Sequence, residues 1–175
     1  GLDDDSVIAA CTSVVSGVVE ATNFNSEGQV VIAGNKAAVD EAMENAKALG
    51  AKRVLPLAVS VPSHCSLMTE AADQLFESLS NTTFEMPTIP VVHNQNADIA
   101  TSVEDIKQLL KKQLYQPVRW ADSVRLLHST GIECLIECGP GKVLSGLTRR
   151  IEKSMQSQSV SDMTSLEKTI KSFSE

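Results

Sequence analysis

One histidine, in the stretch VPSHCSLM at residues 61–68, lies where a general base could work, and the chain has only three histidines. A general base needs a neutral imidazole, a proton donor within reach and a partner for its second ring nitrogen. The apolar spacing downstream predicts that His64 lies in the first turn of a helix, with Ser63 as the N-cap. A helix N-terminus disfavours imidazolium, which suits a neutral base. The alternative is a half-buried histidine that only packs at a helix start.

A nucleophile for His64 is not found in the sequence. Cys65 is adjacent, and neighbouring side chains on a helix point about 100° apart and do not meet. A serine nucleophile normally lies in a G-x-S-x-G elbow, and Ser60, Ser66 and Ser145 lack these flanking glycines. If His64 is a base, we therefore expect its nucleophile outside this sequence.

Two further motifs have a functional and a structural interpretation. GPGK, residues 139–142, differs from a Walker motif because Val143 follows the lysine, so a tight strand-to-helix turn is favoured over a nucleotide-binding domain. Asn23 and Asn25 flank Phe24 between two predicted strands. Their amides could bond the local backbone or point into a pocket.

Metal and disulfide chemistry are not predicted. The histidines at 64, 93 and 128 are far apart, and the cysteines at 11, 65, 134 and 138 form no CxxC pair. Reduced thiols are the expected state.

Composition limits the partners. A net charge of −7 argues against general nucleic-acid binding, which needs a basic face. No apolar run approaches the roughly 18 residues of a membrane span, and the acidic start GLDDDS is unlike a signal peptide, so a cytoplasmic protein is expected. A local basic group could dock an acidic partner. Its members are Lys111, Lys112, Arg119 and Arg125.

The elements that must position these residues alternate between helix and strand, which predicts an α/β protein. Residues 1–59 read as αββαβ. The expected elements are a helix capped by Asp3–Asp5 and stopped by Gly17, strands Val18–Asn23 and Gln29–Ala33, a helix capped by Asn35 and ended by Gly50, and a strand Arg53–Val59. This order is one strand short of the βαββαβ unit, which suggests a piece of a longer chain.

The remaining residues continue the alternation. Helices are expected over Leu67–Leu79, after the capping-box signal at Ser102, from Pro117 to Gly131 and after GPGK, and strands over Thr88–His93 and Ile132–Cys138. After Ser154, the polar run QSQSVSDMTS reads as a linker or tail before a weak helix, Leu166–Phe173.

Four stretches together resemble a known family. NFNSEGQVVIAG, AKRVLPLAVSVPSHCSLM, QLYQPVRW and ECGPGKVLSGLTRRI resemble, in order and spacing, the malonyl-CoA:acyl carrier protein transacylases of bacterial fatty-acid synthesis. The resemblance covers about residues 1–153. It implies a ferredoxin-like small subdomain without its first strand (1–59), the C-terminal part of an α/β-hydrolase-like acyltransferase core (60–153) and a tail (154–175).

The resemblance also implies what lies outside the sequence. The N-terminal half of the family carries the nucleophile elbow, a glutamine, the oxyanion hole and the arginine that pairs with the malonyl carboxylate. We therefore expect the 175 residues alone to be inactive.

Site roles follow from the same resemblance. His64 matches the catalytic histidine, and Gln113 matches the glutamine whose main-chain carbonyl orients that histidine. Asn23 and Asn25 match asparagines that face the active-site cleft. Ser63 matches a position that varies with extender-unit choice.

The implied reaction is malonyl transfer from malonyl-CoA to the phosphopantetheine thiol of acyl carrier protein through a seryl ester. Malonyl-CoA is a substrate, no cofactor or metal is needed, and the complete enzyme is expected to be a monomer. Carrier protein is acidic, so the basic group at Lys111, Lys112, Arg119 and Arg125 is its expected docking surface. The alternative is a non-catalytic α/β module that only binds carrier protein.

Overall fold

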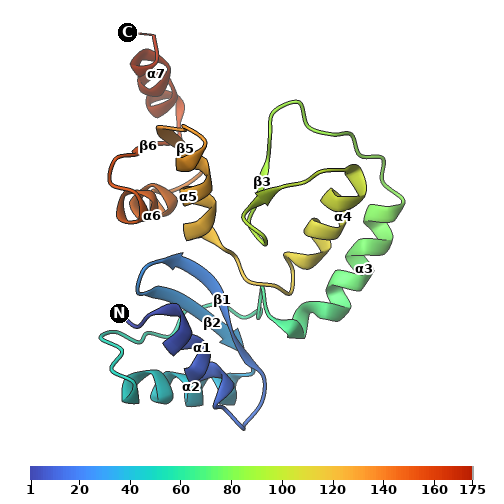
Figure 1. The fold of residues 1–175 in the computed structure, drawn as a ribbon, viewed down its shortest axis with the longest axis vertical. Coiled ribbons are helices and arrows are strands. Elements are labelled where there is room, and N and C mark those ends of the chain that lie inside the picture. Colours follow the sequence, from blue (N-terminus) through green and yellow to red (C-terminus); the bar gives the residue numbers. More distant parts are fainter. Residues whose placement is uncertain (175) are drawn as a thin grey trace. The chain divides into compact units, whose positions relative to one another are not determined.

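The computed structural model describes residues 1–174 as a mixed α/β protein. Two compact units divide it, Gly1–Ser123 and Val124–Glu175. Figure 1 labels most elements of both units. Within residues 1–174, no helix combines the length and the apolar character that crossing a membrane requires.

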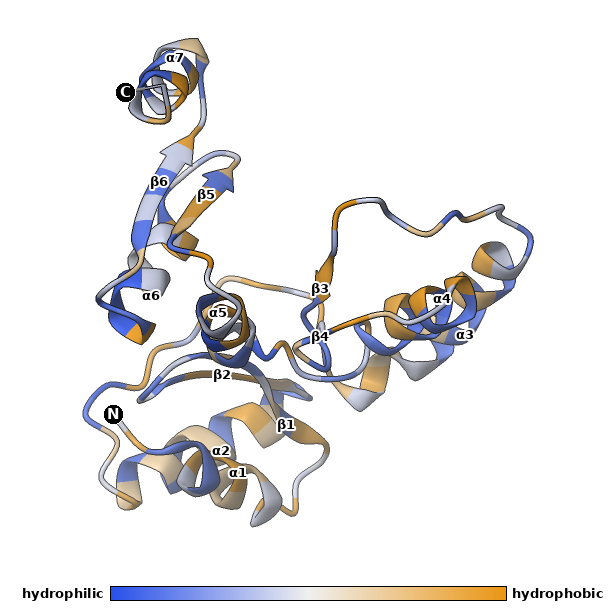
Figure 2. Ribbon diagram, turned by 45° about the horizontal axis from the view of Figure 1, so that its top comes forward, coloured by the Kyte–Doolittle hydropathy of each residue, from blue (hydrophilic) through white to orange (hydrophobic). Residues whose placement is uncertain are grey.

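The N-terminal part is a hairpin with two helices on one face. Strands β1 (Val19–Ser26) and β2 (Gln29–Gly34) pair antiparallel. Helices α1 (Asp4–Thr12) and α2 (Lys36–Ala48) pack against that hairpin in both Figure 1 and Figure 2. Small and branched side chains form the shared core, which lets the helices approach closely. The buried members are Cys11, Val19, Ala38 and Ala42.

Two predicted helix ends differ from the structure, and the first is that α1 ends at Thr12, with Ser13 as its C-cap, and not at Gly17. Asp3 accepts a hydrogen bond from the Ser6 amide, so it caps α1 as expected. Gly50 has φ 93° and ends α2 as expected. Asn35 precedes α2, but its Oδ1 accepts from the Val18 amide, 2.9 Å away, and makes no cap bond. The predicted cap therefore joins β1 to α2 instead.

The predicted strand Arg53–Val59 is wrong. Within residues 1–174 this segment has no strand partner, and a strand is defined by the partner that its backbone bonds. Leu55, Leu57 and Val59 keep 57, 61 and 69% of their surface exposed.

A helical pair and a short hairpin complete the first unit. The short helix η1 (Ser66–Met68) leads into α3 (Thr69–Ser80), which packs beside α4 (Val103–Lys112). Ser102 accepts from the Asp105 amide and caps α4, as predicted. Of the expected strand Thr88–His93, only β3 (Val92–His93) forms, paired with β4 (Asp98–Ile99).

The start of α5 (Trp120–Ser129) corrects another expectation. Pro117 does not begin this helix, because the chain stays extended there and Val118 pairs with β1. The helix stops before Gly131, which has φ 90°, as predicted.

The second unit contains a strand that the sequence did not reveal. Strand β5 (Cys134–Cys138) precedes α6 (Val143–Ile151), and β6 (Gln156–Val160) pairs parallel to β5. The expected linker or tail is therefore wrong over β6, whose hydrophilic residues contrast with β5 in Figure 2. Asp162 and Ser165 form a capping box that begins α7 (Met163–Ser172), and this confirms the predicted last helix.

Candidate active site

His64 lies in a turn and not in a helix. Its φ is 63°, the left-handed region, and the next helix begins only at Ser66 with Cys65 at the N-cap position. The expectations that His64 is in a first helical turn and that Ser63 caps it are therefore wrong. Ser63 is exposed beside it.

The end of α4 holds His64. The Nδ1 atom of His64 lies 2.5 Å from the main-chain oxygen of Gln113, and its amide donates to the main-chain oxygen of Leu114 at 2.9 Å. Gln113 is the C-cap of α4, where carbonyls lack intrahelical partners, and Leu114 is the next residue, so His64 bonds two successive carbonyls just past the helix.

This contact fixes the tautomer of a neutral ring. A carbonyl oxygen can only accept, so the Nδ1 atom of His64 must carry the hydrogen. Nε2 then holds the lone pair and can accept a proton.

Strand β1 bonds to the segment that follows Gln113, the residue that contacts the His64 ring. Val118, five residues after Gln113, donates to the Thr22 oxygen and accepts from the Phe24 amide, each at 2.9 Å. Asn23, half-buried, pairs with Val118 at this bridge. Asn25, also half-buried, follows two residues along β1. Strand β1, which carries both predicted substrate-contacting asparagines, is thus bonded to the segment that follows Gln113.

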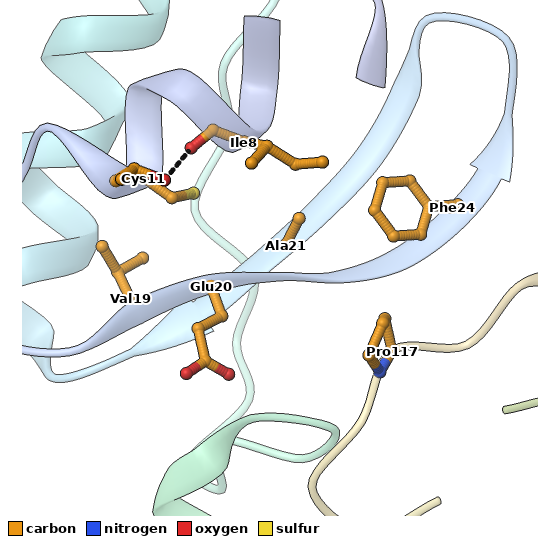
Figure 3. A pocket seen from close by; sticks show the side chains of 8 residues that line it. Ile8, Cys11, Val19, Glu20, Ala21, Phe24 and Pro117 are labelled. Carbon is orange, nitrogen blue, oxygen red and sulfur yellow. Dashed lines mark hydrogen bonds between the residues drawn. The ribbon is translucent and has the colours of Figure 1, made fainter. Parts of the chain in front are cut away.

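A cavity of about 350 Å³ opens between α1 and β1 (Figure 3). Its lining is mainly apolar and includes one thiol. The lining residues are Ile8, Cys11, Thr12, Val19, Glu20, Ala21, Phe24 and Pro117.

The buried thiols are poor nucleophiles. Burial, together with the charge of Glu20, raises the pKa of Cys11 to about 11. Burial also raises the pKa of Cys65, whose side chain is fully buried. Because the thiolate is the reactive form, neither cysteine suits attack at neutral pH.

The described part of the chain offers His64 no serine partner. Across residues 1–174, the Gln113 oxygen is the hydrogen-bond contact of its ring, and no serine hydroxyl reaches it. The same residues contain no group of three histidine, cysteine, aspartate or glutamate side chains placed to hold a metal ion.

A second serine–histidine–carboxylate group lies in the second unit. The Nε2 atom of His128 lies 3.8 Å from the Glu152 carboxylate, and the Ser154 hydroxyl donates to that carboxylate at 2.6 Å. The Nδ1 atom of His128 is buried without a partner in the described residues. The Ser154 oxygen also lies 3.5 Å from Nε2 of His128, but its single hydrogen is donated to the carboxylate. A serine activated by histidine would donate to the ring instead, so this group does not form a nucleophile.

The GPGK turn is capped by its own chain. The Glu137 carboxylate accepts from the Leu144 amide at 3.2 Å and from the Ser145 amide at 2.8 Å. These bonds, chiefly that from Ser145, hold the pKa of Glu137 below its ordinary value. A phosphate would need the same helix N-terminal amides, so the geometry favours the tight turn over nucleotide binding.

The four basic residues do not form one free patch. Lys111 pairs with Asp73 at 2.6 Å and lies over the Phe76 ring, and Arg119 pairs with Asp122 at 2.8 Å. Lys112 is half-buried at the end of α4. Arg125 belongs to the second unit, so it is not placed against the others.

Sequence reasoning missed one residue that contacts the His64 turn. The Glu20 carboxylate on β1 accepts from the amide and the hydroxyl of Ser66, two residues after His64. A single glutamate in a strand carries no sequence signal for such a role.

Two curated proteins with similar sequences carry the same name. The chain is 49% identical over 167 residues to malonyl CoA-acyl carrier protein transacylase of Escherichia coli (strain K12), covering 95% of this chain and 54% of the relative. The same-named protein of Haemophilus influenzae is 51% identical over 166 residues, covering 94% and 53%. No protein-family model matches the chain. The chain thus spans about half the length of the curated relatives it matches.

Solved structures of similarly named enzymes also match this chain. A malonyl-transacylase in complex with its type II polyketide-synthase acyl-carrier protein matches with a TM-score of 0.95 and 48% identity, over 98% of this chain and 56% of that one. An acyl carrier protein S-malonyltransferase from Vibrio cholerae matches with a TM-score of 0.93 and 49% identity, over 97% and 56%. These matches confirm the predicted resemblance.

Proposed function

We propose that this chain supplies the catalytic base for malonyl transfer from malonyl-CoA to acyl carrier protein. The contact between Nδ1 of His64 and the main-chain oxygen of Gln113 carries the proposal, because it leaves Nε2 as the basic atom. Relatives named for this reaction, about 50% identical, supply the substrate class.

The proton steps follow from that geometry. Nε2 of His64 removes the proton of a serine hydroxyl outside this sequence as the serine oxygen bonds to the malonyl carbonyl carbon. The resulting imidazolium gives the proton to the sulfur of coenzyme A as the thioester bond breaks. In the second half-reaction Nε2 accepts the proton of the carrier's phosphopantetheine thiol, whose sulfur takes the malonyl group, and the proton returns to the serine. Throughout these steps the hydrogen stays on Nδ1, which donates it to the Gln113 oxygen.

The finer assignments belong to the same proposal. Residues 1–59 form the ferredoxin-like subdomain, residues 60–153 form part of the acyltransferase core, and no cofactor takes part. Asn23, Asn25 and Ser63 contact the substrate. The bridge between Asn23 and Val118 supports this role for Asn23, because it joins β1 to the segment after Gln113.

The alternative, a module that binds carrier protein without catalysis, is less favoured by the His64 turn. A non-glycine residue with φ 63° is energetically costly and tends to occur at functional sites. A module that only docks has no need to hold an imidazole by one nitrogen.

The direct test is the acyl-enzyme. The full-length protein that contains this chain is mixed with malonyl-CoA labelled in the malonyl group and quenched in acid. A malonyl ester, detected by intact mass and lost on addition of phosphopantetheinylated carrier protein, is the expected result. Carrier binding without any ester would overturn the proposal and support the module.

A further inference from the structure

Glu20 joins the β1 strand to the turn that carries His64. Its Oε2 atom accepts from the Ser66 amide at 2.9 Å, and its Oε1 atom accepts from the Ser66 hydroxyl at 2.5 Å. Both oxygens of one carboxylate thus bond one residue. Hydrogen bonds to a charged acceptor are stronger than neutral ones and more specific in geometry when paired.

The turn needs such an anchor because His64 is strained. A left-handed backbone costs a residue with a Cβ of the order of 1–2 kcal/mol, and it persists only where the surroundings fix it. The ring and the amide of His64 are held by the chain at the end of α4, through the main-chain oxygens of Gln113 and Leu114. Downstream, Cys65 is fully buried and Ser66 is held by Glu20.

The two faces of β1 contact different parts of the chain. In Figure 3 the Glu20 side chain points away from α1, while Ala21 and Val19 lie toward Ile8 and Cys11. This alternation is the ordinary geometry of a strand. The face toward α1 packs the helix, and the opposite face presents the carboxylate to the His64 turn.

We propose that Glu20 is a positioning residue for His64 and acts through Ser66. The proposal rests on the proposed function, in which His64 is the base. Glu20 does not touch the reacting atoms; it fixes the residue that ends the strained turn. Because β1 also bridges to Val118, the strand fixes the position of the His64 turn relative to the Gln113 segment. It thereby fixes the direction in which Nε2 points.

The test uses the full-length protein with four variants. Glu20→Ala removes both acceptors, Glu20→Gln keeps one oxygen for the Ser66 amide, and Ser66→Ala removes only the hydroxyl contact. Glu27→Gln is the matched control, since Glu27 is exposed in the turn at the end of the same strand. The measurements are kcat and KM for malonyl-CoA, and the ¹⁵N shifts of the His64 ring, which report the fraction with hydrogen on Nδ1.

Misplacement of a catalytic group by about 1 Å can cost about 100-fold in rate. We expect Glu20→Ala to lower kcat by about 10- to 100-fold with KM changed by less than about twofold, and to reduce the Nδ1–H fraction of His64. Glu20→Gln and Ser66→Ala should be intermediate, and Glu27→Gln should match the wild type. A merely structural role would lower the melting temperature and leave the His64 ¹⁵N shifts unchanged.

The two proposals fail in different ways. An active wild-type enzyme whose Glu20→Ala variant keeps its kcat and its His64 shifts overturns the positioning role alone. A wild type that forms no malonyl ester overturns the proposed function. In that case the ¹⁵N shifts still decide: a reduced Nδ1–H fraction in Glu20→Ala supports positioning by Glu20, and an unchanged one refutes it.

Discussion

The Nδ1 atom of His64 lies 2.5 Å from the main-chain oxygen of Gln113, although 49 positions separate the two residues. A main-chain oxygen orients the ring as a carboxylate would, but it carries no charge and does not titrate. The orientation of His64 therefore does not depend on the ionisation of a third side chain. The pairing also uses an oxygen that the end of α4 leaves without an intrahelical partner.

The first prediction distinguishes the effect of the His64 imidazole on activity from the effect of its backbone conformation on stability. His64→Asn removes the base but suits φ 63°, because asparagine tolerates the left-handed region. We expect kcat in the full-length enzyme to fall by about 10²–10⁴-fold, the usual contribution of a general base. Steady-state transfer to carrier protein measures it.

His64→Ala provides the comparison, because alanine loses the ring and also strains the turn. It should lose as much activity as His64→Asn and unfold more easily, by roughly 1 kcal/mol. Retention of more than about a tenth of the wild-type kcat by His64→Asn would contradict the assignment of the base.

A second prediction concerns Gln113. Its main-chain oxygen makes the contact, so Gln113→Ala leaves that oxygen in place. We expect kcat to change by less than about threefold, since a lost side chain outside the reaction has a small effect. A loss as large as that of His64→Asn would show that the side chain acts instead, and Gln113→Glu would then test whether its amide NH2 group is required.

Local signals were the part of the fold that could be predicted. Asp3, Ser102, Gly50 and Gly131 end or begin helices as expected, because a cap depends on residues within one turn. Two local signals failed: α1 ends at Thr12, before the predicted Gly17, and Asn35 does not cap α2 because a distant amide, that of Val18, competes for its oxygen.

Features that depend on a distant partner were harder to predict. The apolar segment Arg53–Val59 looks like a strand but finds no partner in residues 1–174, whereas the polar segment Gln156–Val160 is a strand because β5 pairs with it. Pro117 looked like a helix start, yet the extended chain there bonds β1. In the site, motif resemblance predicted the pairing of His64 with Gln113. Glu20 could not be found, because its task depends on the position of Ser66 in space.

A third prediction tests carrier docking at Lys112. Lys111 is held by Asp73 and the Phe76 ring, so its reversal would also disturb packing between α3 and α4. Lys112→Glu avoids that side effect. We expect KM for carrier protein to rise by about 3- to 10-fold while KM for malonyl-CoA stays constant, because a docking charge steers only the protein partner.

The control for docking is Lys36→Glu, an equal charge change on the exposed start of α2. It should leave both KM values within about twofold of the wild type. An equal rise in both KM values for Lys112→Glu, or the same rise in the control, would refute docking at this position.

A fourth prediction follows from the pKa of Cys11, which burial and Glu20 raise to about 11. At pH 8 the thiolate fraction of Cys11 should be about 100-fold smaller in the folded protein than in denaturant. Alkylation by iodoacetamide, followed by peptide mass spectrometry, should show at least that difference in rate, and the folded rate should keep rising with pH up to about 11. Equal rates in folded and denatured protein at pH 8 would contradict the burial of this thiol.

The last prediction concerns the Glu137 cap on α6. Glu137→Ala frees the Leu144 and Ser145 amides, so at neutral pH it should lower the melting temperature by about 2–4 °C, the effect of one lost cap. The folded-state pKa of Glu137 is lowered, so the stability it contributes is present above the ordinary glutamate pKa and is lost as pH falls through the folded value. The difference between wild type and Glu137→Ala should therefore shrink in acid, when thermal melts are followed by circular dichroism from neutral to low pH. Glu133→Ala, an exposed glutamate just before β5, is the matched control and should show no such pH dependence. A gap between wild type and Glu137→Ala that stays constant down to the lowest pH would mean that the carboxylate charge does not stabilise α6.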